Sequence, residues 1–106
     1  MRLMLAKDDV EERELRSIRI GDLWVLLTRV EGTLFALDDQ CNHAGCLLSG
    51  GWLEGSEVVC PCHGRRYDVR SGRNTTVPRL GGDQERYPLD LVGGEVLVEL
   101  PERPRR

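Results

Sequence analysis

Apolar residues along this chain gather in short β-prone runs, with Ile18 and Ile20 two residues apart as in a strand, and no stretch longer than a turn or two has a convincing helical pattern. Residues 23–30 (LWVLLTRV) and 33–37 (TLFAL) are β-prone runs separated by Glu31 and Gly32. Two such runs with a two-residue connection predict a β-hairpin. Residues 16–20 predict a further strand before it.

A second hairpin is predicted near the C-terminus. Residues 87–92 and 95–100 are β-prone and flank the pair Gly93 and Gly94, which supplies the turn. Together the two hairpins predict an antiparallel framework. The large apolar side chains expected in its core include Trp24, Phe35, Trp52 and Leu53.

Between the hairpins lies an insert from Cys41 to about residue 79, rich in glycine and cysteine. Residues 57–60 and 66–69 predict short strands inside it, and residues 70–73 (RSGR) predict a turn. Residues 74–86 are expected to form a loop. The pattern therefore predicts an all-β domain that carries a small separate subdomain.

Length and composition narrow the class of protein. At 106 residues the chain is one small domain, and its 40% hydrophobic residues exclude disorder throughout. The 31% charged residues, with no apolar run near eighteen residues, exclude a membrane span. No secretory signal is visible, because residues 1–6 are followed at once by Lys7, Asp8 and Asp9. A soluble, cytoplasmic protein is expected.

The charge pattern argues against a nucleic-acid partner. The net charge is -3, and the basic residues are scattered among acidic ones rather than gathered in a stripe. Nucleic acid is therefore not expected as a partner.

Two short boxes hold the candidate chemistry. CNHAGC places Cys41 and His43 in CxH spacing, and CPCHG places Cys60 and His63 in CxxH spacing, with the sixteen residues 44–59 between the CxH and CxxH motifs. Two thiolates with two imidazoles suit an iron–sulfur centre that has histidine on one iron. A zinc site is the main alternative, although structural zinc sites usually pair cysteine with cysteine and histidine with histidine.

With these boxes the chain resembles the Rieske family of [2Fe-2S] proteins. The resemblance extends beyond the boxes and is to a small soluble Rieske ferredoxin, in the stretches LFALDDQCNHAGC, GGWLEGSEVVCPCHG, RRYDVRSGR and YPLDLVGGEVLVEL. The resemblance implies one [2Fe-2S] cluster, with Cys41 and Cys60 on one iron and His43 and His63 on the other. It also implies an antiparallel β-sandwich or barrel base with a rubredoxin-like cluster subdomain. Residues 1–101 are then a single Rieske domain, and residues 102–106 a flexible tail.

Two further cysteines match a different branch of the family. Cys46 and Cys62 stand where Rieske proteins of the cytochrome bc type have a disulfide that clamps the cluster loops, whereas dioxygenase ferredoxins usually lack cysteine there. The resemblance thus implies a Cys46–Cys62 disulfide. The alternative is a pair of buried thiols, which a cytoplasmic location favours.

The residues around the boxes are only partly bc-like. Tyr67 stands where the bc-type pattern has a tyrosine that donates to a ligand cysteine, here Cys41, but Arg65 replaces the serine that donates to a bridging sulfide. Ala44 replaces the bulky apolar residue of the quinol contact. Gly45 and Gly64 are expected where the backbone passes close to the cluster, and Pro78 is expected in a loop that covers it. Arg65 and Arg66 flank the cluster and either face an acidic partner or are solvated.

These features favour a one-electron carrier, without catalysis of its own, that passes electrons from a flavin reductase to an oxygenase or another redox enzyme. A catalytic oxygenase subunit needs a second iron site with two more histidines, and the chain has two histidines in all. A subunit of a quinol-oxidising or other respiratory complex, suggested by Cys46 and Cys62, and a disulfide-based redox sensor remain as alternatives.

Overall fold

The computed structural model describes residues 2–7 (backbone only), 9–21, 23–41, 46–62, 64–76 and 82–100. Within these ranges the chain forms ten β-strands and one 3-10 turn and contains no α-helix. The elements are β1 (Arg2–Lys7), β2 (Leu15–Ile20), β3 (Leu23–Val30), β4 (Thr33–Asp38), η1 (Leu48–Gly50), β5 (Trp52–Glu54), β6 (Glu57–Val59), β7 (Arg66–Asp68), β8 (Arg86–Tyr87), β9 (Leu89–Val92) and β10 (Glu95–Glu99).

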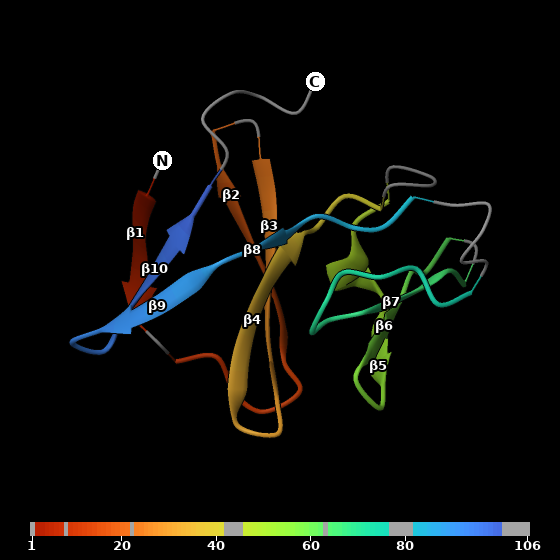
Figure 1. The fold of residues 1–106 in the computed structure, drawn as a ribbon, viewed down its shortest axis with the longest axis horizontal. Coiled ribbons are helices and arrows are strands. Elements are labelled where there is room, and N and C mark those ends of the chain that lie inside the picture. Colours follow the sequence, from red (N-terminus) through yellow and green to blue (C-terminus); the bar gives the residue numbers. More distant parts are fainter. Residues whose placement is uncertain are drawn as a thin grey trace.

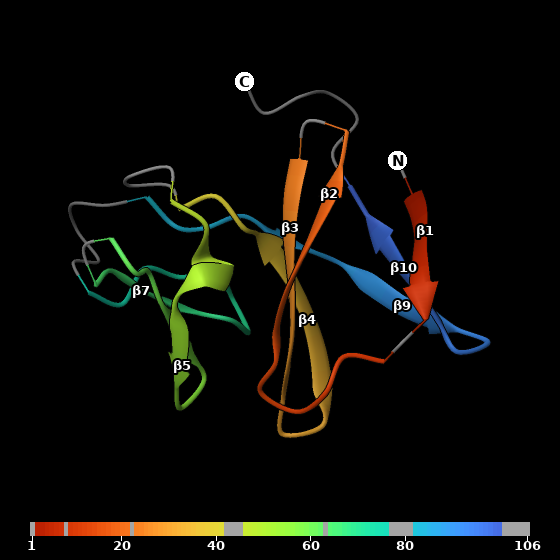
Figure 2. The same cartoon turned by 180° about the vertical axis from the view of Figure 1, so that it is seen from behind.

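The strands form three antiparallel sheets, ordered β1-β10-β9, β2-β3-β4-β8 and β5-β6-β7. Figure 1 shows the four-stranded sheet in the middle, with the β1-β10-β9 sheet on one side and the β5-β6-β7 subdomain on the other, and Figure 2 shows the same order from behind. The two larger sheets form the base. The all-β class and the separate small subdomain are as predicted.

Strand β3 is buried on both faces, which explains the unbroken apolar run Leu23–Leu27 in its first part. Val25 and Leu27 belong to the core between the two base sheets, whereas Leu26 and Val30 belong to a second core shared with the β5-β6-β7 subdomain. Because successive side chains of a strand point to opposite faces, this one strand joins both cores. The second core also contains Cys41 and Cys60.

The predicted first hairpin is present: β3 pairs with β4 in a register that ends at Val30 opposite Thr33. Glu31 and Gly32 both have positive φ, 53° and 80°, as a two-residue hairpin connection of this kind requires. In the second hairpin, Val92 pairs with Glu95 around Gly93 and Gly94. Both hairpins are thus confirmed.

One predicted strand is wrong as a continuous element. Residues 87–92 divide at Pro88, so that β8 pairs with β4 in the middle sheet while β9 pairs with β10 in the outer sheet. Proline has no backbone N–H to donate to a ladder, which ends pairing at that position. Strands β1 and β5 were not predicted, and β1 pairs with β10 from the far end of the chain.

Trp52 corrects the predicted core. Its side chain is 49% exposed, and its indole N–H donates to Glu54 Oε2 at 2.8 Å on the solvent side of β5. Phe35 and Leu53 pack at the edge of the second core as partly buried side chains. Trp24 is half-buried and stacks with the guanidinium of Arg19, 5.3 Å from the ring centroid.

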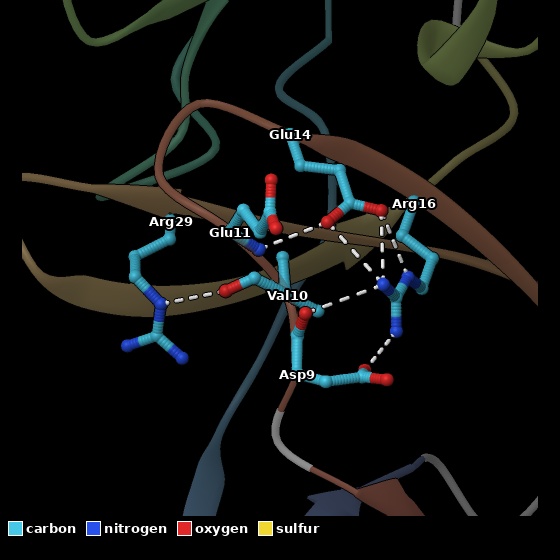
Figure 3. A network of polar contacts seen from close by, with 6 residues as sticks. All are labelled: Asp9, Val10, Glu11, Glu14, Arg16 and Arg29. Atoms are coloured by element: carbon cyan, nitrogen blue, oxygen red, sulfur yellow. Dashed lines mark hydrogen bonds and ion pairs between the residues drawn. The ribbon is translucent and has the colours of Figure 1, made fainter.

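Residues 9–14 carry the chain from the outer sheet to the middle sheet and are held there by polar contacts (Figure 3). Arg16 on β2 forms ion pairs with Asp9 and, at 3.0 Å, with Glu14. Arg29 on β3 donates from Nε to the Val10 carbonyl at 2.9 Å. The connection between the base sheets is therefore fixed to two strands.

The part of the chain that the structure describes contains no helix long and apolar enough to cross a membrane.

Candidate metal centre

Two six-residue loops form the candidate site, and each begins at a buried cysteine. The loop 41–46 follows β4 and the loop 60–65 follows β6, with Cys41 0% and Cys60 1% exposed. The Cys41 N–H donates to the Cys46 carbonyl at 2.6 Å, and the Cys60 N–H donates to the Arg65 carbonyl at 2.8 Å. Both loops are thus closed by the same bond between their first and sixth residues, which gives the two cysteines equivalent positions.

A disulfide joins the two loops. Cys46, the last residue of the first loop, is bonded to Cys62 in the middle of the second, with Cα atoms 6.4 Å apart. The predicted bridge is confirmed, and the alternative of two buried thiols is wrong. Closing a chain segment of this length stabilises the fold by about 3 kcal/mol, because it restricts the unfolded chain.

The predicted cluster ligands divide into two groups. Cys41 and Cys60 are the cysteines outside the disulfide, and both lie in the second core. His43 and His63 lie outside the described residues, as do the predicted cluster-loop residues Gly45 and Pro78. The structure therefore shows where the two cysteines lie, and the ligand role of all four residues stays a prediction.

Tyr67 on β7 reaches Cys41, the first predicted ligand cysteine. Its side chain is 0% exposed, and its Oη lies 3.5 Å from Cys41 Sγ, within hydrogen-bond distance for sulfur. Burial raises the pKa of Tyr67 well above its ordinary value, and the hydrogen bond and charge of Cys41, with a smaller effect of Cys60, act in the same direction. The tyrosine is therefore neutral and has a proton to donate to a thiolate.

The surroundings of Cys41 and Cys60 fit a metal centre. Two sulfur atoms outside any disulfide are buried among apolar side chains, where the negative charge of a thiolate is costly to bury. Bound iron would offset that charge, and thiolate sulfur is the soft ligand that iron–sulfur clusters use. The hydroxyl of Tyr67 satisfies one remaining acceptor position on Cys41.

The two arginines after the second box have different environments. Arg66 forms ion pairs with Glu54 at 2.7 Å and Glu57 at 3.4 Å across the β5-β6-β7 sheet. The indole of Trp52 and then Arg66 lower the pKa of Glu54 below its ordinary value. Arg65 is half-buried, and no carboxylate of the described ranges pairs with it. Of the two, Arg65 is the one whose charge stays available near the site.

Gly64 has a conformational reason to be glycine. Its φ is +73°, and its N–H donates to the Cys60 carbonyl at 3.0 Å, so the second loop turns back on its own first residue. Residues with a Cβ rarely adopt that conformation. No described protein atom lies within 4 Å of a Cβ built there, so the requirement comes from the backbone rather than from crowding by the protein.

Gly51 supports the second loop and was not predicted as a site residue. A Cβ at Gly51 would lie 1.8 Å from the Val59 carbonyl oxygen and 3.2 Å from Pro61 Cδ. Only glycine lets the chain after η1 pass this close beneath the loop. The Gly50-Gly51 pair is the signal in the sequence, but it does not reveal which backbone approaches.

Asp39 fixes the first loop and was also missed. Its side chain is fully buried, and it accepts from the Ser49 N–H and the Ser49 hydroxyl, both at 2.7 Å. The Leu48 N–H donates to the Asp39 carbonyl at 2.7 Å, so the chain before and after the loop is held together. An aspartate beside a loop is a signal for such side chain to backbone bonding, without revealing the partner.

Gln84 connects the base to the cluster subdomain. Its buried side-chain amide donates to the Asp38 carbonyl at 2.7 Å and to the Gln40 carbonyl, at the start of the first loop. Its own N–H donates to the Gly72 carbonyl at 2.6 Å, in the turn after β7. One residue therefore bonds to both parts of the molecule.

These features define an all-β protein with a cysteine-based cluster site on a clamped pair of loops, and the comparison with known families agrees. The model of the Rieske [2Fe-2S] domain matches residues 2–92 of this chain. The chain belongs to this family, and its cofactor is one Rieske-type [2Fe-2S] cluster.

Relatives place it among the ferredoxins of the family. The chain is 32% identical over 93 residues, 88% of each chain, to the ferredoxin component of the naphthalene 1,2-dioxygenase/salicylate 5-hydroxylase systems of Ralstonia sp. The ferredoxin of carbazole 1,9a-dioxygenase from Nocardioides aromaticivorans IC177 superposes with a TM-score of 0.81 at 27% identity, over 92% of this chain and 95% of that one. A ferredoxin solved in complex with the oxygenase of carbazole 1,9a-dioxygenase gives 0.82 at 27% identity, over 92% and 100%. Such relatives are electron-transfer proteins rather than catalytic enzymes.

Proposed function

We propose that this protein is a soluble, cytoplasmic one-electron carrier that accepts electrons from a flavin reductase and passes them to an oxygenase. The observation that carries the proposal is the pair of buried cysteines, Cys41 and Cys60, at equivalent positions of two clamped loops in a Rieske domain. The relatives named as ferredoxin components of dioxygenase systems support the choice of partners. The proposal treats residues 1–101 as a single domain, with the cluster subdomain at about residues 41–79.

In this proposal Cys41 and Cys60 hold one iron, and His43 and His63 hold the other. When bound, the cluster supplies reversible one-electron chemistry, and neutral imidazoles in place of thiolates make the added electron easier to accept. The chain contributes apolar surroundings that bury both cysteines, and a hydrogen bond from Tyr67 to Cys41. That bond favours the more negative, reduced state.

The second loop offers the surface at which a partner approaches. Pro61, Cys62 and Gly64 are exposed, whereas Cys60 at the start of the same loop is buried. Burial of the first residue of this loop keeps water away from Cys60, and exposure of the middle of the loop presents its backbone to another protein. This arrangement suits electron transfer from one protein to another and needs no substrate pocket.

A quinol-oxidising role is the second candidate, and the Cys46–Cys62 disulfide is the observation that favours it. Ala44 and Arg65 stand in place of the apolar residue and the serine of the bc-type pattern and argue against it. The two functions differ in the pH dependence of the potential. A carrier is expected to show a flat potential near neutral pH, and a high potential that falls steeply with rising pH would favour quinol oxidation.

Reconstitution tests the proposed partners. The purified protein is combined with the NADH-dependent flavin reductase and the oxygenase of a naphthalene dioxygenase system, and both NADH consumption and product are measured. We expect turnover that requires this protein and that is lost in the His43→Ala and His63→Ala variants. Reduction of the protein by the reductase without product formation would contradict the oxygenase as acceptor.

A further inference from the structure

The four cysteines differ in their access to thiol reagents. Cys62 is exposed, and its disulfide partner Cys46 is half-buried against the second core. Cys41 and Cys60 are 0% and 1% exposed. A reagent arriving from solvent therefore meets Cys62 first.

We propose that Cys62 is a site of thiol–disulfide exchange, at which a cytoplasmic dithiol reductant opens the Cys46–Cys62 bridge and converts a clamped carrier into an open one. The proposal rests on the proposed cytoplasmic function, because reductants that keep thiols reduced are abundant in that compartment. Exposed disulfides are the ones that such reductants reach and that serve regulatory roles.

The second loop carries a positive charge close to Cys62 in the sequence. Arg65 lies three residues after Cys62 and has no carboxylate partner in the described ranges, whereas Arg66 forms ion pairs with Glu54 and Glu57. A thiol reductant attacks as the thiolate, so a loop with an uncompensated positive charge favours its approach.

The exchange balances in two steps. A thiolate of the reductant attacks Cys62 Sγ, the Cys46–Cys62 bond breaks, and its electron pair leaves on Cys46 Sγ, which takes up a proton. The second thiol of the reductant then attacks its own sulfur in the mixed disulfide and releases Cys62, which is protonated in turn. Two electrons and two protons move from the dithiol, which becomes a disulfide, and a disulfide oxidant reverses the reaction.

Opening the bridge changes how the loops are held to each other rather than their individual shapes. Each loop keeps its own closing bond, from Cys41 to Cys46 and from Cys60 to Arg65. The covalent link between them is lost, while Gly51 still packs beneath the second loop. We therefore expect an open form that retains the cluster but releases it faster.

A thioredoxin–thioredoxin reductase couple with NADPH provides the probe. The anaerobic holoprotein is treated, alkylated and digested, and the spectrum of the cluster is recorded on the same sample. We expect alkylation at Cys46 and Cys62 but not at Cys41 or Cys60, retention of the spectrum, and severalfold faster bleaching by an iron chelator than in untreated protein. A bridge that opens only after denaturation, or an unchanged bleaching rate, would overturn the proposal.

Glutathione identifies the sulfur that is attacked. Because it is a monothiol, its mixed disulfide persists long enough for peptide mass analysis. We expect the adduct on Cys62, and an adduct on Cys46 would contradict the assignment.

A variant lacking both bridge cysteines, Cys46→Ser with Cys62→Ser, provides the matched control. It is expected to bleach at the rate of the reduced wild type and not to respond to thioredoxin. If this variant does not accumulate as folded protein, the comparison of thioredoxin-treated with untreated wild type decides the question alone. Absence of a cluster spectrum before any treatment would contradict the proposed function, whereas an inert bridge in protein with a normal spectrum would contradict only the exchange.

Discussion

At the scale of single residues, two buried tyrosines separate the tuning of the cluster from the stability of the fold. Tyr67 Oη lies 3.5 Å from Cys41 Sγ, whereas Tyr87 Oη is buried without a hydrogen-bond partner in the described ranges. The same tyrosine to phenylalanine substitution therefore removes a hydrogen bond to the predicted ligand Cys41 at one position and an unsatisfied hydroxyl at the other.

We expect Tyr67→Phe to lower the reduction potential of the cluster. Loss of one hydrogen bond to sulfur destabilises the reduced state by about 1 kcal/mol, which corresponds to about 40 mV for one electron. Redox titration followed by the visible spectrum measures the shift. The Tyr87→Phe variant is the matched control, and equal shifts in both variants would contradict the role of Tyr67.

Tyr87→Phe is expected to raise the free energy of unfolding by about 1 kcal/mol, because it removes a buried hydroxyl without a partner. Burial, and then the charge of Asp38, raises the pKa of Tyr87 above its ordinary value. The wild type therefore has its full stability below the pKa of an unfolded tyrosine and loses part of it as the pH rises above that value. Chemical denaturation of both proteins at neutral and alkaline pH measures the gain of stability in the variant and the pH dependence of the wild type. A Tyr87→Phe variant less stable than the wild type at neutral pH would contradict the prediction.

At the scale of elements, neighbouring glycines below the second loop differ in what they tolerate. A Cβ at Gly51 would meet the Val59 carbonyl at 1.8 Å, whereas a Cβ at Gly50 would meet Pro61 Cγ at 3.7 Å, an ordinary contact. We expect Gly51→Ala to destabilise the fold by about 1–3 kcal/mol, because the backbone must shift. It should also speed loss of the cluster.

Gly50→Ala is the control for this substitution. It adds the same methyl group one residue earlier and is expected to leave both the denaturation midpoint and the chelator bleaching rate near the wild-type values. Equal denaturation midpoints and equal bleaching rates in the Gly51→Ala and Gly50→Ala variants would show that the close approach of Gly51 to the Val59 carbonyl is not needed.

The hairpins were predictable because their signals are local, and several other elements were not. The pattern of residues 23–37 carries both strands and the Glu31-Gly32 turn. Strand β1 instead depends on pairing with β10 across the whole chain, which no local pattern reveals. Trp52 was expected in the core because it is large and aromatic, but its strand is an edge and its indole N–H bonds to Glu54 at the surface.

The candidate site was predictable to the extent that its chemistry lies in short motifs. The boxes and the resemblance they carry led to the Cys46–Cys62 bridge and to the contact between Tyr67 and Cys41. The supports of the loops, Asp39 and Gln84, were missed because their partners are set by the folded chain. The sequence does not show which backbone groups a common polar residue such as aspartate or glutamine will bond to.

At the scale of the whole molecule, the middle sheet links the base to the cluster subdomain. Its strand β3 contributes to both cores, and Gln84 bonds to the carbonyls of Asp38 and Gln40 as well as to Gly72. Figure 1 shows the subdomain projecting from this sheet on the side opposite the β1-β10-β9 sheet. The position of the ligand loops therefore depends on contacts made far from the cysteines.

We expect Gln84→Leu to lower the free energy of unfolding by about 1–3 kcal/mol, because the buried carbonyl of Asp38 and the partly buried carbonyl of Gln40 lose their donor. Loss of the cluster should become faster while the potential of the loaded protein stays within a few millivolts of the wild type. Chemical denaturation and redox titration measure the two effects. A large change of potential without a change of stability would contradict a purely connecting role.

The central claim is a cluster held by two cysteines and two histidines, and one measurement tests it most directly: electron paramagnetic resonance of the reduced protein during a redox titration. We expect two irons per chain, a Rieske-type signal, and a potential within about -150 to +300 mV. A silent spectrum with bound zinc, or a potential near the roughly -400 mV of clusters held by four cysteines, would contradict the account.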